Sequence, residues 1–394
     1  MIRRFLAAAL LLAPLPAIAE DTPPPATVVV GFDAKTITPL IVEGVANKDT
    51  GRPVEANDPV RIASISKLIM GFVAMRLFDE GKIELERDVL DYLGWKLRSP
   101  YHPKAKVTLV DLLSHRAGLS DAGDYVIPLG ASLEAKMAER SSWRDTGPPG
   151  KAAFEYANLG SPVVATVLEA ASGERYDRLV ERLVFKPLGI TACLNWIGCG
   201  LDLEARAVTL YRHTGEIAAD GPAGLPPACT IPVAEGQACS LDAYVPGTNA
   251  SIFSPQGGVR IGMVDLAKIG QALLRGPDSG LLGENAFTIY AVSALSGETG
   301  SAELFCHYGL ALQAIQIPGT PGCDDDLFGS GGPYVGHPGE AYGLLSGLWF
   351  DVSRMRGFVY VTTANPPPPG GEDTGNFTPR EKALMARAVE LADK

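Results

Sequence analysis

Ser64 and Lys67 are the first residues whose types and spacing suit a chemical role. They stand in Ser64-Ile-Ser-Lys67, at the start of a run whose apolar residues predict a buried helix ending near Gly81. Residues three positions apart share one helix face, so the serine hydroxyl and the lysine amine can come within hydrogen-bonding reach. Burial favours the neutral amine, which can take the proton of a serine nucleophile. Ser66 is turned away and is the weaker candidate. The alternative is an ordinary helix cap followed by a surface lysine.

Two later segments carry further candidate groups. In Tyr156-Ala-Asn158, residues two apart in an extended loop point the same way. The phenol can then carry a proton and the amide can bind a substrate; the alternative is a turn with a packed tyrosine. In His337-Pro-Gly339, the histidine can donate a hydrogen bond or a proton, and the glycine lets a substrate backbone approach closely. The alternative is a glycine-rich hairpin with an exposed histidine.

The elements that must position these groups follow an informative order. Strands come first, then a mainly helical block, then strands and a final helix, which predicts a sheet made from both chain ends with helices inserted. Strands are expected at 27–32, 40–45, 308–317, 344–352 and 357–363, and helices at 107–113, 160–171, 176–185, 265–274 and 379–394.

The same order predicts the domain boundaries. Residues 20–81 and 245–394 form a sheet domain that carries the nucleophile helix, and residues 82–190 form an inserted helical domain. Residues 191–244 are rich in Cys, Gly and Pro and are expected to be an insertion stapled by disulfides.

The first 19 residues are predicted to be a secretory signal. Arg3 and Arg4 precede an apolar stretch, and Ala17-Ile-Ala19 has the form of a cleavage site. An uncleaved anchor is the alternative, although the apolar run is short for a membrane span. The protein is therefore expected to be exported, to the periplasm or outside the cell.

All six cysteines lie after the predicted signal. An even number in an exported protein indicates disulfides, and six cysteines allow fifteen pairings. Neighbours in sequence suggest Cys193–Cys199, Cys229–Cys239 and Cys306–Cys323. A zinc site is the alternative, but the sequence has no CxxC or HExxH pattern.

Composition narrows the possible partners. The net charge of -11 argues against a nucleic-acid partner. No stretch reaches the roughly 18 apolar residues of a membrane span, so no stable membrane span is expected. No cofactor or metal is expected, and the sequence does not indicate an oligomeric state. The expected partner is a small-molecule or peptide-like substrate.

The order Ser64-x-x-Lys67, Tyr156-x-Asn158, His337-x-Gly339 resembles the serine β-lactamase and penicillin-binding-protein superfamily. The likeness covers about residues 30–365 and includes four more segments: Asp111-Leu-Leu-Ser-His-Arg-Ala-Gly-Leu119, Phe154-Glu-Tyr-Ala-Asn-Leu-Gly160, Pro187-Leu-Gly-Ile190 and Gly257-Gly-Val-Arg-Ile-Gly-Met-Val-Asp-Leu-Ala267.

This resemblance implies an α+β fold, with an antiparallel sheet flanked by helices, an inserted helical domain and the site in the cleft between them. Ser64 would form an acyl-enzyme, Lys67 and Tyr156 would exchange its proton, and Asn158 would orient the substrate. The oxyanion would bind the backbone N–H of Ser64 and a second one near 342–344. His115 would be structural and bond backbone near the cleft.

One position departs from the family pattern. The third motif commonly reads Lys-Thr-Gly, whereas this chain has His337-Pro338-Gly339. A histidine is mostly neutral at pH 7, so recognition of a substrate carboxylate should be weaker than with a lysine. HxG variants resemble the D-aminopeptidase-like and family VIII esterase-like members, including relatives of class C β-lactamases.

The leading hypothesis is therefore hydrolysis of an ester or amide through a Ser64 acyl-enzyme. One alternative is a penicillin-binding or sensor-type protein that acylates with little turnover. Others are a D,D-carboxypeptidase, a true β-lactamase, or a non-catalytic protein that binds the cell wall or a partner.

Overall fold

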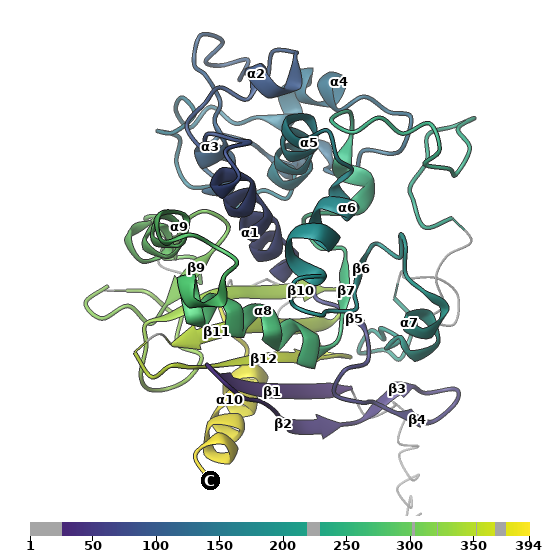
Figure 1. Cartoon of the computed structure of the whole chain (residues 1–394), viewed down its shortest axis with the longest axis vertical. Coiled ribbons are helices and arrows are strands. Elements are labelled where there is room, and N and C mark those ends of the chain that lie inside the picture. Colours follow the sequence, from purple (N-terminus) through teal and green to yellow (C-terminus); the bar gives the residue numbers. More distant parts are fainter. Residues whose placement is uncertain (1–25, 219–228, 302–303, 321, 352, 367–375) are drawn as a thin grey trace, which may run out of the picture.

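A seven-stranded antiparallel sheet forms the base of the molecule (Figure 1). The computed structural model describes residues 26–218, 229–301, 304–320, 322–351, 353–366 and 376–394. The strand order is β2-β1-β12-β11-β10-β9-β8. The strands are β1 (Thr27–Asp33), β2 (Ile37–Glu43), β8 (His307–Tyr308), β9 (Gln313–Ile315), β10 (Tyr334–Ala341), β11 (Leu344–Asp351) and β12 (Arg356–Thr362). β1 pairs with β12, so the two chain ends meet inside one sheet, as expected for the predicted α+β fold.

Helices cover both faces of this sheet. α8 (Met263–Arg275) packs across β1, β11 and β12, and α10 (Pro379–Ala392) contacts β1 and β2. Alternate residues of a strand point to opposite faces. Accordingly, Val28 belongs to the main core that includes α8, whereas Val29 packs in a second core with Met385 of α10. The sheet is therefore buried on both sides.

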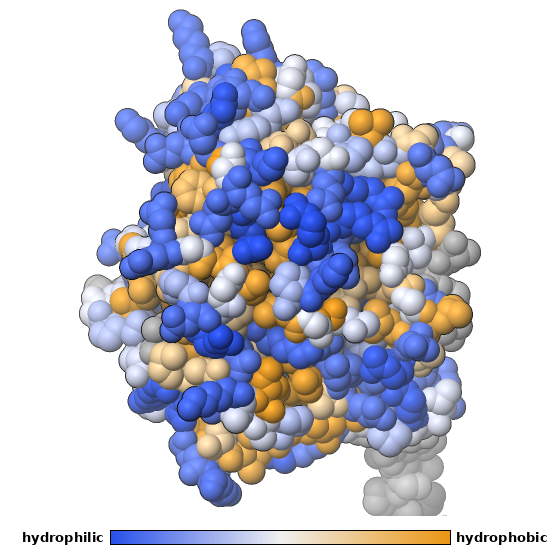
Figure 2. Space-filling model, viewed as in Figure 1, coloured by the Kyte–Doolittle hydropathy of each residue, from blue (hydrophilic) through white to orange (hydrophobic). Residues whose placement is uncertain are grey.

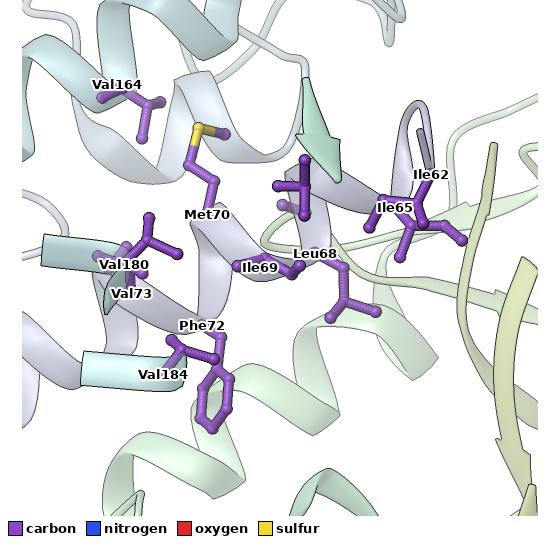
Figure 3. Close-up of a cluster of buried hydrophobic side chains, with 14 of the residues drawn as sticks. Ile62, Ile65, Leu68, Ile69, Met70, Phe72, Val73, Val164, Val180 and Val184 are labelled. Atoms are coloured by element: carbon purple, nitrogen blue, oxygen red, sulfur yellow. The ribbon is translucent and has the colours of Figure 1, made fainter. Parts of the chain in front are cut away.

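α1 (Ile65–Asp79) joins the sheet to the helical part of the chain. It contacts β10 on one side and the helices α5 (Gly160–Ser172) and α6 (Tyr176–Val180) on the other. Met70 lies toward Val164 of α5, and Val73 lies beside Val180 of α6 (Figure 3). Each fully buried large apolar side chain contributes about 1.5–3 kcal/mol. The apolar surface around most of α1 thus holds the helix firmly in the interior, as its sequence predicted.

Helices α2 (Leu90–Leu93), α4 (Leu133–Ala138) and α5 (Gly160–Ser172) lie on the far side of α1 from the sheet, whereas α9 (Glu284–Ser296) packs beside β8 and β9 (Figure 1). α3 begins with the predicted threonine cap: Thr108 accepts from the backbone N–H of Asp111, and Asp111 in turn accepts from the backbone of Thr108. The other helices are α3 (Leu109–Leu113) and α7 (Leu201–Arg206), with a π-helical turn η3 (Glu181–Phe185) and the 3-10 turns η1 (Asp121–Gly123), η2 (Arg140–Ser142), η5 (Ala250–Phe253) and η6 (Gly276–Ser279).

Two small sheets complete the described structure. One pairs β3 (Val45–Asn47) with β4 (Arg52–Pro53), and the other has the order β5-β7-β6. The strands of the second are β5 (Val60–Arg61), β6 (Cys193–Leu194) and β7 (Val259–Ile261). β5 leads directly into the segment that contains Ser64.

The largest differences from the sequence-based expectation concern three elements. The single strand expected at 308–317 is two short strands, β8 and β9, because the chain turns at Ala311, where φ is +61°. The expectation also missed α9 and β10. β10 contains two glycines and Pro338, which are unusual inside a strand. They are tolerated because β9 pairs only with Tyr334–Gly336 and leaves the rest of that edge of β10 open.

All three expected disulfides form: Cys193–Cys199, Cys229–Cys239 and Cys306–Cys323. The predicted signal at 1–19 lies outside the described residues. Within the described ranges, no helix is long and apolar enough to cross a membrane. Hydrophilic and apolar residues are intermixed over the face in Figure 2, which is usual for a surface that contacts water.

Candidate active site

Ser64 lies at the junction of β5 and α1. The preceding residue, Ala63, has φ +47°, a left-handed conformation that costs a non-glycine residue about 1–3 kcal/mol and is concentrated at functional sites. Ser64 occupies the N-cap position of α1, but its side chain makes no capping hydrogen bond. Ser66 differs: it is buried, and its hydroxyl accepts from the backbone N–H of Val259 at 3.2 Å. Of these two serines, Ser64 therefore presents the available hydroxyl.

The Lys67 amine lies in contact with Ser64. Its Nζ is 3.2 Å from Ser64 Oγ, 2.8 Å from Asn158 Oδ1 and 3.1 Å from the carbonyl oxygen of Gln256. Burial lowers the pKa of Lys67 to about 7, and the charge of Asp121 opposes this shift. A neutral amine has two N–H groups and one lone pair. Both N–H groups can be donated to the two carbonyl oxygens, and the lone pair then faces the Ser64 hydroxyl.

Tyr156 packs over the same amine. Lys67 Nζ lies 4.7 Å from the centre of the phenol ring. The phenol oxygen is buried and makes no hydrogen bond of ordinary geometry within the described structure, although the nearby Ser64 side chain affects its ionisation. Burial raises the pKa of Tyr156 above its usual value, more than Ser64 lowers it. The phenol therefore keeps its proton at a pH where Lys67 is neutral.

Asp121 holds Asn158 in place. One carboxylate oxygen of Asp121 accepts from the backbone N–H of Asn158 at 2.9 Å and from its Nδ2 at 3.0 Å. The other accepts from the backbone N–H of Leu159 at 2.9 Å. Because the amide nitrogen of Asn158 is bound to Asp121, its oxygen must face Lys67. Sequence reasoning missed Asp121; its signal was an acid two residues after the segment 111–119.

His115 supports the loop that carries Tyr156. Its Nδ1 accepts from the backbone N–H of Ala157 at 3.2 Å, and its ring centre is 4.5 Å from that of Tyr156. Burial lowers the pKa of His115 well below its usual value, so the ring is neutral. The expected backbone bond of His115 near the cleft is thereby confirmed.

His337 is fully buried on β10. Its Nδ1 lies 2.6 Å from the carbonyl oxygen of Pro338, and its Nε2 lies 3.0 Å from the Tyr308 hydroxyl. A carbonyl only accepts, so Nδ1 carries the proton and Nε2 accepts from Tyr308. Burial, together with Lys67, lowers the pKa of His337 to about 3. The histidine is therefore neutral, and both of its nitrogens are occupied inside the protein.

Gly339 lies where β10 passes closest to the nucleophile. A side chain here would collide with the carbonyl oxygen of Ile62, two residues before Ser64. Residues Tyr342 and Gly343 form the turn between β10 and β11, further along the hairpin. The approach of β10 to Ser64 is thus at Gly339, ahead of the region 342–344 where a second oxyanion donor was expected.

A cavity of about 1400 Å³ opens at these residues. Of the six predicted site residues, Ser64, Tyr156, Asn158 and Gly339 line it. Lys67 lies behind Ser64, and His337 is not among the lining residues. Its other walls include Arg61, Tyr125, Trp196, Arg212, Gln256, Phe305, Glu340 and Tyr342. The structure therefore brings the predicted residues together, with His337 behind the cavity wall.

Comparison with known proteins agrees with this fold. Residues 26–377 match the Beta-lactamase family, and the chain belongs to that family. Penicillin-binding protein 4 of Amycolatopsis lactamdurans is 25% identical over 183 residues, which are 46% of this chain and 46% of that protein. Esterase EstB of Burkholderia gladioli is 28% identical over 166 residues, which are 38% of this chain and 42% of that protein. The chain thus matches less than half the length of each of these relatives.

A solved structure extends the likeness to nearly the whole chain. The class C beta-lactamase from Rhodobacter sphaeroides superposes with a TM-score of 0.65 over 94% of both chains, at 18% sequence identity. At this identity the superposition shows the shared fold. The protein is therefore a member of the Beta-lactamase family, related to a penicillin-binding protein and to an esterase.

Proposed function

We propose that this protein is an exported serine hydrolase that cleaves an ester or amide bond through an acyl-enzyme on Ser64. The observation that carries the proposal is the contact of 3.2 Å between Lys67 Nζ and Ser64 Oγ. The pKa of Lys67, lowered to about 7, makes the amine an available base near neutral pH. The similarity to esterase EstB and to penicillin-binding protein 4 also supports this proposal.

The proton path follows from the two opposite pKa shifts. The neutral amine of Lys67 takes the proton of Ser64 as the serine oxygen attacks the carbonyl carbon of the substrate. When the bond to the leaving alcohol or amine breaks, Tyr156 gives its proton to the leaving group. The Lys67 ammonium then returns its proton to Tyr156, and both groups regain their starting state. Water releases the acyl group through the reverse use of the same groups.

Backbone groups would hold the developing negative charge. The N–H of Ser64 at the start of α1 is one donor, since helix N-termini favour negative charge. We assign the second to Glu340, because β10 comes closest to the nucleophile at Gly339, which directly precedes it. Asn158 would bind the substrate amide or ester carbonyl group beside the nucleophile.

The substrate is not selected by a permanent cation at the third motif. His337 is neutral and turned into the protein, so a substrate carboxylate gains no charge contact there. We therefore expect neutral esters and amides to be processed more readily than substrates that depend on a carboxylate at this position.

Labelling by a fluorophosphonate probe tests the nucleophile. The purified protein is incubated with the probe, and the modified residue is located by mass spectrometry. We expect one adduct on Ser64, none in Ser64→Ala, and normal labelling in Ser66→Ala, the matched control. Absence of an adduct on Ser64 in folded protein would refute the proposal.

The similarity to a penicillin-binding protein favours a second candidate, a protein that acylates with little turnover. The lifetime of the acyl adduct separates the two. A panel of esters, D-peptides and β-lactams is mixed with the protein, and intact mass is followed over time. Release of product within minutes supports the hydrolase, and a persistent adduct supports the binding or sensor role. Turnover of D-peptides or of β-lactams would instead identify a D,D-carboxypeptidase or a true β-lactamase.

Export is supported by the three disulfides, which form in oxidising compartments. The signal at 1–19 remains a prediction. N-terminal sequencing of the protein recovered from a periplasmic or extracellular fraction would test it, with Glu20 expected as the first residue.

A further inference from the structure

Phe305 packs directly on the ring of Tyr156. The two ring centres are 4.6 Å apart and the ring planes are inclined by 15°, a stacked arrangement. Phe305 is half-buried and lines the cavity. The Tyr156 hydroxyl has no hydrogen bond of ordinary geometry in the described structure, although the Ser64 side chain is near enough to affect its ionisation. The contacts of the ring therefore contribute to where that hydroxyl points. Phe305 is one of those contacts, and neither it nor its segment belongs to the family motifs.

Hydrogen bonds hold described residues at both ends of the segment that connects α9 to β8 and carries Phe305. Gln313 of β9 donates from Nε2 to the carbonyl oxygen of Leu304. Near the start of the segment, Arg116 donates to the carbonyl oxygen of Glu298 at 2.5 Å. Arg116 directly follows His115, which also contacts Tyr156. Glu298 is thus anchored to Arg116, in the same loop as His115, which supports Tyr156.

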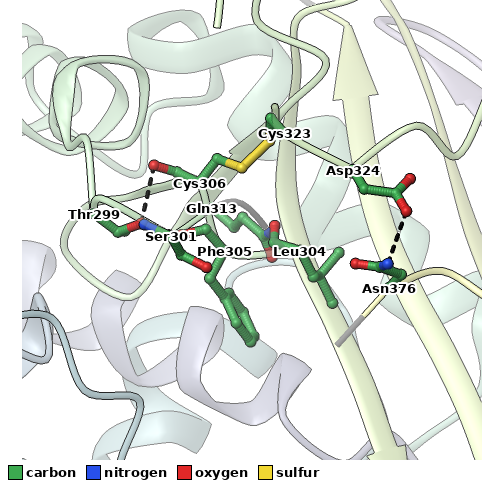
Figure 4. Close-up of a disulfide and its surroundings, with 9 residues drawn as sticks. All are labelled: Thr299, Ser301, Leu304, Phe305, Cys306, Gln313, Cys323, Asp324 and Asn376. Carbon is green, nitrogen blue, oxygen red and sulfur yellow. Dashed lines mark hydrogen bonds between the residues drawn. A yellow bond between two sulfur atoms is a disulfide. The ribbon is translucent and has the colours of Figure 1, made fainter. Parts of the chain in front are cut away.

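The disulfide Cys306–Cys323 fixes the residue next to Phe305. It links the start of β8 to the segment between β9 and β10, 17 residues later, with a Cα–Cα distance of 6.0 Å. Cys306 is buried and Cys323 is partly exposed, so the end of the link beside Phe305 lies inside the protein. Figure 4 shows the Phe305 ring projecting away from the disulfide on the other side of the backbone. The covalent link therefore restricts the backbone from which the ring extends.

We propose that Phe305 is a positioning residue for Tyr156, held in place by the Cys306–Cys323 disulfide. This inference rests on the proposed function, in which Tyr156 supplies a proton to the leaving group. Phe305 keeps the phenol ring against Lys67 and excludes water from the pair. Without the stacked ring, the phenol can tilt and water can reach the Lys67 amine. Breaking the disulfide should act in the same direction, because it loosens the backbone that carries Phe305.

The titratable and polar groups that face Tyr156 determine how loss of the Phe305 contact should change the pH dependence of the site. They are Ser64, Lys67 of α1, His115 of the supporting loop, Asp121 of η1, Tyr308 of β8 and His337 of β10. Both histidines have lowered pKa values and are neutral near pH 7, and burial raises the pKa of Tyr308. Lys67 is then the group that changes charge near neutrality. Water entering beside it would raise its pKa toward the usual value, because burial is what lowers it.

The test is the rate of fluorophosphonate labelling of Ser64 in the full chain, measured from pH 5 to pH 9. This readout needs no knowledge of the substrate. We expect Phe305→Ala to label about tenfold more slowly, since a misplaced catalytic group costs rates of this order or more, and the midpoint of its pH profile to move upward. Phe305→Tyr, which keeps the stacked ring, should label within about threefold of the wild type. Phe287→Ala on α9 removes a half-buried phenylalanine outside the cavity and serves as the matched control.

A second pair of variants tests the disulfide. Cys306→Ser with Cys323→Ser should lower the labelling rate and raise the midpoint, whereas Cys193→Ser with Cys199→Ser should change neither. If Phe305→Ala does not fold, Phe305→Leu keeps most of the volume without the ring and is measured in its place. Wild-type rate and midpoint in the alanine or leucine variant would overturn the inference, as would equal slowing in Phe287→Ala. Failure of the wild type to label would instead overturn the proposed function, and the inference with it.

Discussion

Asp121→Asn is the substitution that most directly tests how the site is built. In the wild type, Asp121 accepts three hydrogen bonds from Asn158 and Leu159 and places one negative charge near Lys67. Asparagine keeps the size but has one acceptor oxygen and one donor amide, so at least one of these bonds is lost. The charge is lost as well. Asn158 is then free to turn its amide nitrogen toward Lys67, which would disturb the base.

The size of the effect follows from the charge and from the geometry. A unit charge one amide group away is worth of the order of 1–2 kcal/mol in a protein interior, which is about one pKa unit. Asp121 raises the pKa of Lys67, so its removal should lower the midpoint from about 7 to roughly 6. The labelling rate above the midpoint should fall about 10- to 100-fold, as expected for a misplaced catalytic group.

The assay is again the labelling rate of Ser64 as a function of pH. Asp124→Asn is the matched control, because Asp124 lies three residues further along and its carboxylate accepts from the backbone N–H groups of Tyr125 and Val126. It should leave the midpoint unchanged. A midpoint in Asp121→Asn that stays at the wild-type value, or moves upward, would refute the electrostatic part of the argument. A lowered midpoint with an unchanged rate would refute the positioning part.

Three further predictions follow from the structure. The pKa of His337 is lowered to about 3 and that of Lys67 to about 7, so His337→Gln should keep the wild-type midpoint of the labelling rate near neutrality. Lys67→Ala should slow labelling by about 10²- to 10⁴-fold and abolish the midpoint. A shifted midpoint in His337→Gln would contradict the assignment of the midpoint to Lys67. Burial raises the pKa of Glu169 from 4.5 to about 7, so between these pH values the native protein holds a proton that the unfolded chain releases. The free energy of unfolding should therefore fall as pH rises through this window, by up to about 3 kcal/mol. Urea unfolding at pH 4.5 and pH 8 measures this fall, which should disappear in Glu169→Gln; an equal fall in both proteins would exclude Glu169 as its cause. Gly339→Ala places a methyl group against the carbonyl oxygen of Ile62. By pushing β10 away, it should slow Ser64 labelling about tenfold or more, while the circular dichroism spectrum stays unchanged. Normal labelling would show that β10 can shift without cost.

The sequence by itself determined many of the local elements and the pair Ser64 and Lys67. Ser64 and Lys67 share one face of α1 because helix geometry alone places residues three apart together, and the apolar residues around them required burial. The cap of α3 and the disulfides between sequence neighbours were also readable, because each depends on residues a short distance apart. The family pattern added Tyr156 and Asn158 at the right distances along the chain.

Only the tertiary structure decided how these groups are oriented. Asp121 bonds Asn158 and Phe305 stacks on Tyr156 because loops far apart in sequence meet in one cleft. His337 faces Tyr308 inside the protein because β10, which was not predicted as a strand, sets the direction of its side chains. Such contacts depend on how distant elements pack, and local periodicity carries no information about that. Burial of Lys67 already predicted a lowered pKa, but the tertiary structure decided how far it falls, because the charge of Asp121 opposes the effect of burial.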